Sequence, residues 1–179
     1  MTFHNLISDD ATNKDLKINV KKIFLSEDDH LLDQPIHQAI TLAVSLSLQN
    51  NAITEAAYAY SEDLDEKMQN AAKIAASTMA MNNIFYRATH LIQSTSLIQQ
   101  PAGLRMQGIS QHGIDASVFE LMSLAISAIN GCGMCLQSHY KQLQPHFSDA
   151  QITEALRIAS VLHALQQERF IQQTTVCMA

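Results

Sequence analysis

Residues 117–144 read SVFELMSLAISAINGCGMCLQSHYKQLQ, and their pattern is typical of helices. Its first four residues, Ser117 to Glu120, have the form of a capping box, in which a serine opens a helix and a glutamate three residues later bonds back to it. An apolar run continues to about Asn130, where Gly131 interrupts it. A second helix should begin just after this glycine and continue to about Gln144. The stretch therefore predicts two consecutive helices joined by a short break.

Helical patterns extend over most of the remaining chain. Pro35 stands where a first helical turn tolerates proline, and an apolar segment follows it to about Gln49. A second capping-box pattern, Ser148 to Gln151, introduces a last long helix that reaches about Gln172. Further helices are predicted over residues 11–25, 54–61 and 65–80, with MNNIFYR following at 81–87, a break at the acidic residues 27–29 and a loop over about 101–113.

The composition agrees with a helical protein. The chain has 179 residues but only five glycines, three prolines and no tryptophan, which disfavours the many turns of a sandwich or barrel. A hydrophobic fraction of 47% with 16% charged residues argues against disorder. We therefore predict an all-α fold, organised as a single domain over residues 1–179.

Two segments in the first half of the chain resemble two in the second half. TLAVS at residues 41–45 resembles SLAIS at 123–127, and AAKIAA at 71–76 resembles ALRIAS at 155–160, in the same order. The pattern indicates two related helical halves, over about 16–90 and about 115–172, although Ala-rich helices also match by chance. In this alignment Asn50, Ile53 and Ala57 stand in the places of Cys132, Cys135 and His139.

Charge and hydropathy exclude several classes of function. A net charge of −6 without a basic run disfavours nucleic-acid binding. No apolar run approaches the roughly 20 residues that cross a bilayer, and the first 17 residues lack the apolar core of a signal peptide. We expect a cytoplasmic protein that binds neither membrane nor nucleic acid. Thiols are kept reduced in that compartment, so a close cysteine pair there is more often catalytic or metal-binding than structural.

The pair Cys132-x-x-Cys135 is the main candidate for chemistry. Residues three apart lie on one helical face, so the two sulfurs can form a disulfide without unfolding the helix. The unpaired N–H groups of a first helical turn favour thiolate over thiol, and the thiolate is the nucleophile. Gly131 and Gly133 leave little bulk beside Cys132, which predicts that a large partner can approach this sulfur.

Two further residues extend the candidate site. His139 lies one helical turn after Cys135 and could take its proton, directly or through a water. If the two helices pack antiparallel around Gly131, Glu120 could point at His139, orient its ring and stabilise the imidazolium. The competing interpretation is that Glu120 only caps its own helix.

Other interpretations of these residues remain open. Cys132, Cys135, His139 and Glu120 could instead hold a zinc ion, although the second cysteine knuckle that is typical of structural zinc sites is absent, so no metal is assigned. The remaining thiol, Cys177, is interpreted as a passive tail residue. Two methionines, Met79 and Met81, are interpreted as core packing.

The combined motif is similar to that of a known family. The run from Phe119-Glu120 through Ser127–Cys132 and Cys135 to Ser138-His139 resembles the Glu…Cys-x-x-Cys-x-x-x-His motif of alkyl hydroperoxidase D, within the carboxymuconolactone decarboxylase-like superfamily. MNNIFYR at 81–87 and LRM at 104–106 also resemble stretches of its two-lobed members. The similarity extends from about Leu16 to Gln172.

The resemblance implies a helical fold, usually trimeric, and a peroxidase without a bound cofactor. It implies that Cys135 is the peroxidatic nucleophile, that Cys132 resolves the sulfenic acid to a disulfide, and that His139 with Glu120 forms a proton relay. The helix dipole alone would favour Cys132 as the attacking thiol. The implied partners are a peroxiredoxin of the alkyl hydroperoxide reductase system and a lipoylated 2-oxoacid dehydrogenase component, whose dihydrolipoyl groups would donate electrons.

Two positions depart from the family pattern. Gly133-Met134 stands between the cysteines where some members carry a histidine, and Tyr140 follows the histidine where an acidic residue is frequent. Both departures leave the two cysteines in place, but they could change how well the proton relay works and thus the rate of peroxide reduction. The leading hypothesis is a thiol-dependent peroxidase that reduces organic hydroperoxides. The alternatives are a thiol–disulfide adaptor without direct peroxidase activity and a zinc-stabilised, non-catalytic module.

Overall fold

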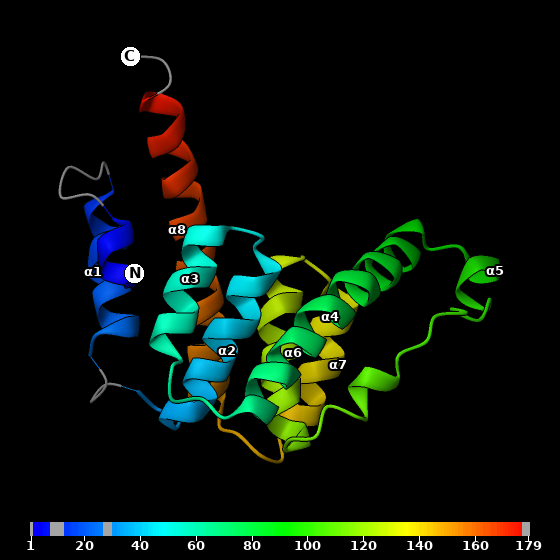
Figure 1. Ribbon diagram of the computed structural model, residues 1–179. Coiled ribbons are helices and arrows are strands. Elements are labelled where there is room, and N and C mark those ends of the chain that lie inside the picture. Colours follow the sequence, from blue (N-terminus) through cyan, green and yellow to red (C-terminus); the bar gives the residue numbers. More distant parts are fainter. Residues whose placement is uncertain (1, 8–12, 27–29, 177–179) are drawn as a thin grey trace.

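The fold is a bundle of helices, shown in a computed structural model that describes residues 2–7, 13–26 and 30–176 (Figure 1). Within these ranges there is no strand, which confirms the all-α prediction. The elements, in order, are η1 (Phe3–Leu6), α1 (Lys14–Phe24), α2 (Gln34–Ser47), α3 (Asn51–Tyr60), α4 (Glu66–Ile92), α5 (Thr95–Ile98), η3 (Gln107–Ile109), α6 (Ala116–Ile129), α7 (Gly133–Leu143) and α8 (Asp149–Val176).

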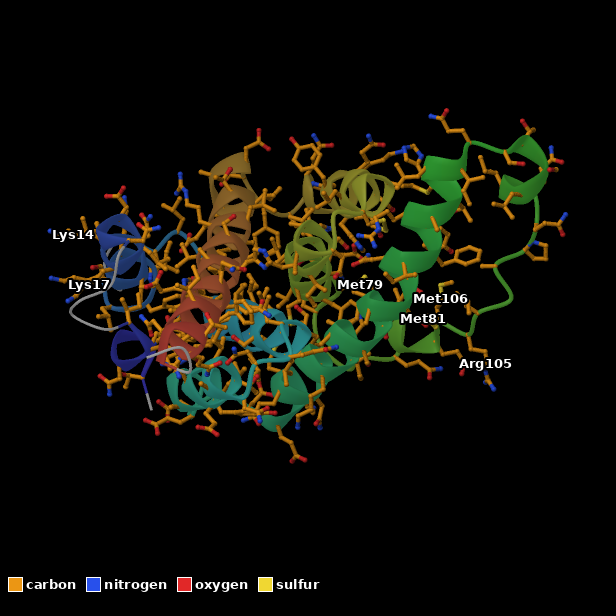
Figure 2. The ribbon with its side chains drawn as sticks, turned by 90° about the horizontal axis from the view of Figure 1, so that it is seen from above. Lys14, Lys17, Met79, Met81, Arg105 and Met106 are labelled. Atoms are coloured by element: carbon orange, nitrogen blue, oxygen red, sulfur yellow. A yellow bond between two sulfur atoms is a disulfide. The ribbon has the colours of Figure 1, made fainter. Side chains whose placement is uncertain are left out.

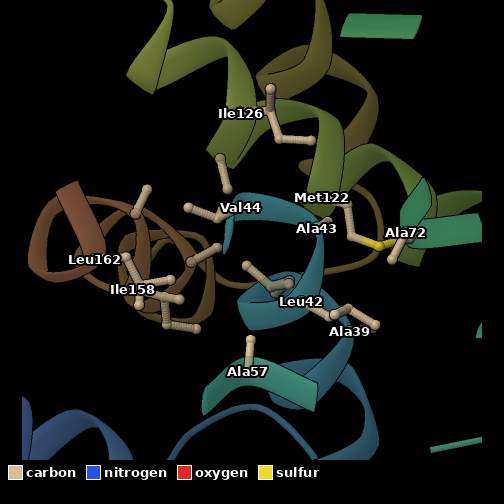
Figure 3. Close-up of a cluster of buried hydrophobic side chains, with 14 of the residues drawn as sticks. Ala39, Leu42, Ala43, Val44, Ala57, Ala72, Met122, Ile126, Ile158 and Leu162 are labelled. Carbon is tan, nitrogen blue, oxygen red and sulfur yellow. The ribbon is translucent and has the colours of Figure 1, made fainter. Parts of the chain in front are cut away.

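Helix α2 forms the centre of the core. It packs against α3, α4, α6 and α8, and its residues from His37 to Ser45 are all buried. The small side chains of Ala39 and Ala43 let neighbouring helices approach closely, while Leu42 and Val44 fill the space between them (Figure 3). Because neighbouring helices surround this part of α2, its polar side chains, such as Thr41 and Ser45, are buried along with the apolar ones. Of the helices in the described ranges, none combines the length and the apolar character required to span a membrane.

The arrangement of α2, α3 and α4 recurs in α6, α7 and α8. Helices α2 and α6 both have 14 residues, and each is followed by a residue with positive φ, Gln49 at 56° and Gly131 at 64°. In both halves the next residue, Asn50 or Cys132, caps the following helix. The resemblance between segments 41–45 and 123–127 thus falls in helices of equal length, and the two related halves stay a prediction.

Several predicted boundaries differ from the structure. The segments predicted at 65–80 and 81–87 form one helix, α4, which continues to Ile92 and ends at Gln93 with φ of 54°. The predicted loop over 101–113 is preceded by α5 and includes the short helix η3. Part of the first predicted helix, residues 11–12, and the acidic break at 27–29 lie outside the described residues.

The first predicted capping box is wrong, and the second is confirmed. Helix α6 is capped by Asp115, whose carboxylate accepts from the N–H groups of Ser117 and Val118 at 2.8 and 3.4 Å. Ser117 lies inside the helix and donates its hydroxyl to the same carboxylate. At α8 the box forms as expected: the Ser148 hydroxyl accepts from the Gln151 N–H, and the Gln151 side chain accepts from the Ser148 N–H. Glu120 is therefore left without a capping role.

Candidate active site

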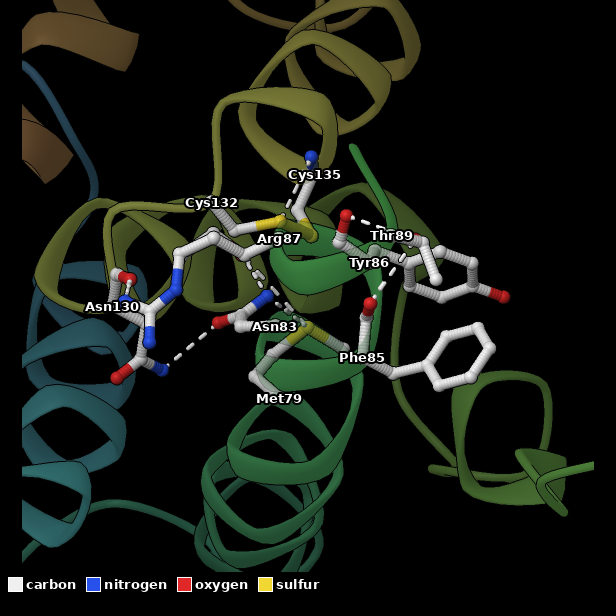
Figure 4. The surroundings of a disulfide bond; sticks show 10 residues. Met79, Asn83, Phe85, Tyr86, Arg87, Thr89, Asn130, Cys132 and Cys135 are labelled. Carbon is white, nitrogen blue, oxygen red and sulfur yellow. Dashed lines mark hydrogen bonds between the residues drawn. A yellow bond between two sulfur atoms is a disulfide. The ribbon is translucent and has the colours of Figure 1, made fainter. Parts of the chain in front are cut away.

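Cys132 and Cys135 form a disulfide at the beginning of α7 (Figure 4). The chain leaves α6 at Ile129, and Gly131 turns it with a φ of +64°, a conformation that glycine adopts without strain. Cys132 then caps α7, with its Sγ accepting from the Cys135 N–H at 3.3 Å. The two Cα atoms are 5.3 Å apart, within the usual range for a disulfide. The spacing of the cysteines thus produces the cross-link that it predicts.

The two cysteines are both buried but lie in different surroundings. Cys132 is 0% exposed and Cys135 is 7% exposed, and only Cys135 lines a cavity. The expectation that flanking glycines make Cys132 approachable is therefore wrong for the oxidised protein. A Cβ at Gly133 would meet nothing within 4 Å, so the open space lies beside the backbone of that glycine and not beside the Cys132 sulfur.

A histidine–carboxylate pair stands next to the disulfide. His139 Nδ1 and Glu120 Oε2 are 2.6 Å apart, and both side chains are 12% exposed. The pair forms because α6 and α7 pack against each other on either side of the Gly131 turn. Gln142 donates a further hydrogen bond, at 3.3 Å, to the same Glu120 oxygen. With Nδ1 engaged, the Nε2 atom of His139 is the one available for proton transfer.

Cys135, His139 and Glu120 line one cavity of about 250 Å³. Its walls come from α4, α6, α7 and the segment around η3, and they are mainly apolar. The remaining lining residues are Met79, Asn82, Asn83, Tyr86, Met106, Ile109, Met134, Ser138 and Gln142. Two of these, Met79 and Met106, are labelled in Figure 2. Met79 is also part of the core, as its interpretation as packing predicts, whereas Met81 is only half-buried.

A buried polar network ties α4 to the turn that carries Cys132 (Figure 4). Asn83 is fully buried; its amide donates to the Ser127 hydroxyl at 2.9 Å and accepts from the Asn130 amide at 2.9 Å. The guanidinium of Arg87 donates to the backbone carbonyl of Asn130. The Cys132 N–H donates to the carbonyl of Ser127 at 3.1 Å. The network fixes the α6–α7 turn, and sequence reasoning missed it, although a polar pair in an Ala-rich helix was a signal.

The neighbouring Asn82 has an unsatisfied atom at the cavity. Its Oδ1 is buried and has no hydrogen-bond partner in the described ranges, and the residue lines the cavity beside Cys135. A buried polar atom without a partner costs free energy, so this oxygen is available to a ligand that carries a donor.

The two departures from the family pattern lie in different environments. Met134 lines the cavity, so the position between the cysteines presents a thioether there. Tyr140 faces away from it and donates its hydroxyl to Asp149 at 2.9 Å, which raises the pKa of Tyr140. The third cysteine, Cys177, lies outside the described residues.

Comparison with known proteins supports one family. Residues 97–171 match the model of the carboxymuconolactone decarboxylase family. The chain is 41% identical over 164 residues to alkyl hydroperoxide reductase AhpD of Coxiella burnetii, covering 90% of this chain and 93% of the relative. It is 40% identical over 154 residues to the protein of that name from Acidobacterium capsulatum, covering 85% and 83%. A third relative so named, from Solibacter usitatus, is 41% identical over 156 residues, covering 85% of each chain. The chain therefore belongs to the alkyl hydroperoxide reductase AhpD family, within the carboxymuconolactone decarboxylase superfamily.

Proposed function

We propose that this protein is a thiol-dependent peroxidase that reduces organic hydroperoxides by cycling Cys132 and Cys135 between dithiol and disulfide. Membership of a family of alkyl hydroperoxide reductases makes the chain an enzyme with a peroxide-related redox function. The observation that carries the finer proposal is that one cavity is lined both by Cys135 and by the hydrogen-bonded pair His139–Glu120. A nucleophile, a base and a group that orients the base thus face the same space.

In the proposed cycle, Cys135 of the reduced enzyme transfers its proton to His139 Nε2, directly or through a water. The Cys135 thiolate attacks the terminal peroxide oxygen, which breaks the O–O bond and leaves a sulfenic acid on Cys135. The alkoxide takes the proton from His139 and leaves as an alcohol. The Cys132 thiol then attacks the sulfenic sulfur, so that a disulfide forms and water leaves. Glu120 holds the tautomer of His139 and stabilises the transient imidazolium.

The walls of the cavity support an organic substrate. The side chains of Met79, Met106 and Ile109 offer apolar surface to an alkyl group. The unpartnered Asn82 Oδ1 can accept a hydrogen bond from the hydroperoxide O–H inside the cavity that Cys135 also lines. Hydrogen peroxide has no alkyl group and would gain less from these contacts.

The proposal includes an electron donor and partners. A dihydrolipoyl dithiol, carried by a lipoylated 2-oxoacid dehydrogenase component, would reduce the disulfide and become the cyclic lipoyl disulfide. The enzyme would also reduce a peroxiredoxin of the alkyl hydroperoxide reductase system; its relatives are named alkyl hydroperoxide reductase. A cytoplasmic homotrimer completes the proposal. Exposed apolar side chains near the end of α4 and in α5 support contacts between subunits, which would cover them: Leu91, Ile92 and Ile98.

The alternative functions receive less support from the site. An adaptor that only exchanges disulfides with proteins makes no use of the mainly apolar cavity that Cys135 shares with the hydrogen-bonded pair His139–Glu120. A zinc module on Cys132, Cys135, His139 and Glu120 needs both thiolates, whereas the two sulfurs are joined in a disulfide.

The proposal is tested by peroxide turnover without any peroxiredoxin. The wild-type protein and Cys135→Ser are given dihydrolipoamide and cumene hydroperoxide, and peroxide loss is followed with time. We expect sustained turnover by the wild type, unchanged turnover by Cys177→Ser, and none by Cys135→Ser. If the wild type consumes peroxide only after a peroxiredoxin is added, the adaptor function is correct.

A further inference from the structure

A second group of reactive side chains lies away from the disulfide, where the segment before α2 meets α8. His30 comes from that segment, His37 from α2 and Glu154 from α8. One potential metal-ligating atom of each residue lies within 4.8 Å of the others. It is the one such group of three or more histidine, cysteine or acidic residues in residues 2–7, 13–26 and 30–176.

His37 presents an unsatisfied nitrogen to this group. The residue is 0% exposed, and its Nδ1 lies 3.0 Å from the Tyr60 hydroxyl. The other nitrogen, Nε2, is buried without a hydrogen-bond partner in the described part of the chain and lies 4.0 Å from Glu154 Oε1. When Nδ1–H donates to Tyr60, the neutral ring of His37 carries a lone pair on Nε2.

Like His37, His30 and Glu154 each use one side-chain atom in hydrogen bonds and keep a second atom that could bind a metal. His30 Nε2 lies 2.9 Å from the carbonyl oxygen of Ile23 and donates to it, which leaves the lone pair on Nδ1. Glu154 Oε2 accepts from the N–H groups of Leu31 and Leu32 at 2.7 and 3.1 Å, which leaves Oε1. Metal-binding histidines characteristically donate their second nitrogen to a carbonyl or another acceptor, and ligating carboxylates are hydrogen-bonded in turn.

We propose that His30, His37 and Glu154 bind a divalent transition-metal cation, with Zn²⁺ as the best match. Two imidazoles and one carboxylate are a known zinc ligand set. The cation would satisfy the buried Nε2 of His37 and the free oxygen of Glu154 together. A cavity of about 350 Å³, lined by His30 and Glu154, provides an entry path and room for a fourth ligand. The site would connect the α1–α2 segment to α8.

Occupancy should rearrange the two imidazoles. Their rings are now stacked, with centroids 4.1 Å apart and planes 6° from parallel. Zinc–nitrogen bonds are about 2.0–2.1 Å long, so the two nitrogens must converge on one point and the rings must tilt. His30 is the ring that moves, because it is half-buried and lies outside the helices, whereas His37 is enclosed in the core.

The test is metal titration of the oxidised protein, whose disulfide keeps Cys132 and Cys135 from binding metal, in a Cys177→Ser background. We measure Zn²⁺ stoichiometry by calorimetry and the absorption spectrum of Co²⁺ as a substitute. The variants are His30→Ala, which spares the core, and Glu154→Gln. The matched control is His163→Ala, which removes an exposed histidine from α8.

We expect one Zn²⁺ per chain, a rise in the unfolding temperature with Zn²⁺, and a Co²⁺ spectrum without a thiolate charge-transfer band. His30→Ala should lose the stoichiometric site while keeping its helical circular dichroism, and His163→Ala should retain it. Stoichiometric binding by His30→Ala, a thiolate band, or no binding by the folded parent protein would each overturn the proposal. If Glu154→Gln fails to fold, His30→Ala still decides. Because the titration uses no peroxide, its failure leaves the peroxidase proposal standing.

Discussion

Cys132 occupies in α7 the position that Asn50 occupies in α3. The Cys132 sulfur accepts from the Cys135 N–H at 3.3 Å, and the Asn50 side chain accepts from the Ile53 N–H at 3.2 Å. Both residues follow a residue with positive φ. In the first half of the fold, the turn before α3 therefore provides only a helix cap. In the second half the same geometry brings a sulfur over the N-terminus of a helix, one turn from a second sulfur.

The disulfide should be reversible and exclusive to this pair. Because the two sulfurs share one helical turn, oxidation should join Cys132 to Cys135 and leave Cys177 as the only free thiol. Non-reducing peptide mapping after alkylation, before and after treatment with dithiothreitol, measures this. A predominant disulfide to Cys177 would be incompatible with the assignment.

The His139–Glu120 pair should affect the rate of peroxide turnover far more than the stability of the fold. His139→Ala and Glu120→Ala should each slow peroxide turnover by about 10²–10⁴-fold, as expected for lost general-base catalysis. Because Asp115 caps α6, Glu120→Ala removes no helix cap, and the lost hydrogen bonds to His139 and Gln142 should lower the free energy of unfolding in urea by only about 1 kcal/mol. Full activity in Glu120→Ala would remove this carboxylate from the relay.

Asp115→Ala provides the matched control, since it should reduce stability and spare turnover. Losing the cap should lower the free energy of unfolding by about 1 kcal/mol. Hydrogen bonds from the Ser117 hydroxyl and N–H hold the pKa of Asp115 below its ordinary value of 3.8. A depressed folded-state pKa adds stability above the unfolded pKa and loses it as the pH falls through the folded value. The difference between wild type and variant, measured in urea, should be full at pH 7 and smaller at pH 3. An equal difference at both pH values would show that the carboxylate charge contributes nothing.

The sequence predicts the local parts of this site and misses the long-range ones. The Gly131 break and the spacing of Cys132, Cys135 and His139 are visible because each depends on residues within one or two helical turns. The sequence pattern predicts the N-cap of α6 at Ser117, but the N-cap is Asp115. Both are good capping residues, and only the path of the backbone decides between them.

Local sequence patterns cannot predict contacts between residues that are far apart in the chain. Asn83 bonds to Ser127 across 44 positions, and this tertiary network keeps α4 continuous where two adjacent asparagines weaken helix propensity. Glu154 bonds to Leu31 across 123 positions, so the group with His30 and His37 has no local signature in the sequence.

The helix dipole and the proton relay predict different cysteines as the attacking thiolate. The dipole and the free N–H groups at the start of α7 favour a thiolate at Cys132, the N-cap. His139 favours one at Cys135, since a base one turn away supplies a proton acceptor and then a cationic neighbour. Access separates the two: Cys135 lines the cavity, and Cys132 is fully buried behind it.

We therefore expect Cys135 to attack peroxide. Cys132→Ser should consume one equivalent of hydroperoxide and stop at a sulfenic acid on Cys135, which dimedone traps and mass spectrometry locates. Its serine hydroxyl can still cap α7, so the fold should persist. Cys135→Ser should consume none, because the remaining thiol at Cys132 neither lines the cavity nor lies one turn before His139. If dimedone instead labels Cys132 in Cys135→Ser, at the wild-type rate of the first step, the dipole outweighs the relay and the two roles are reversed.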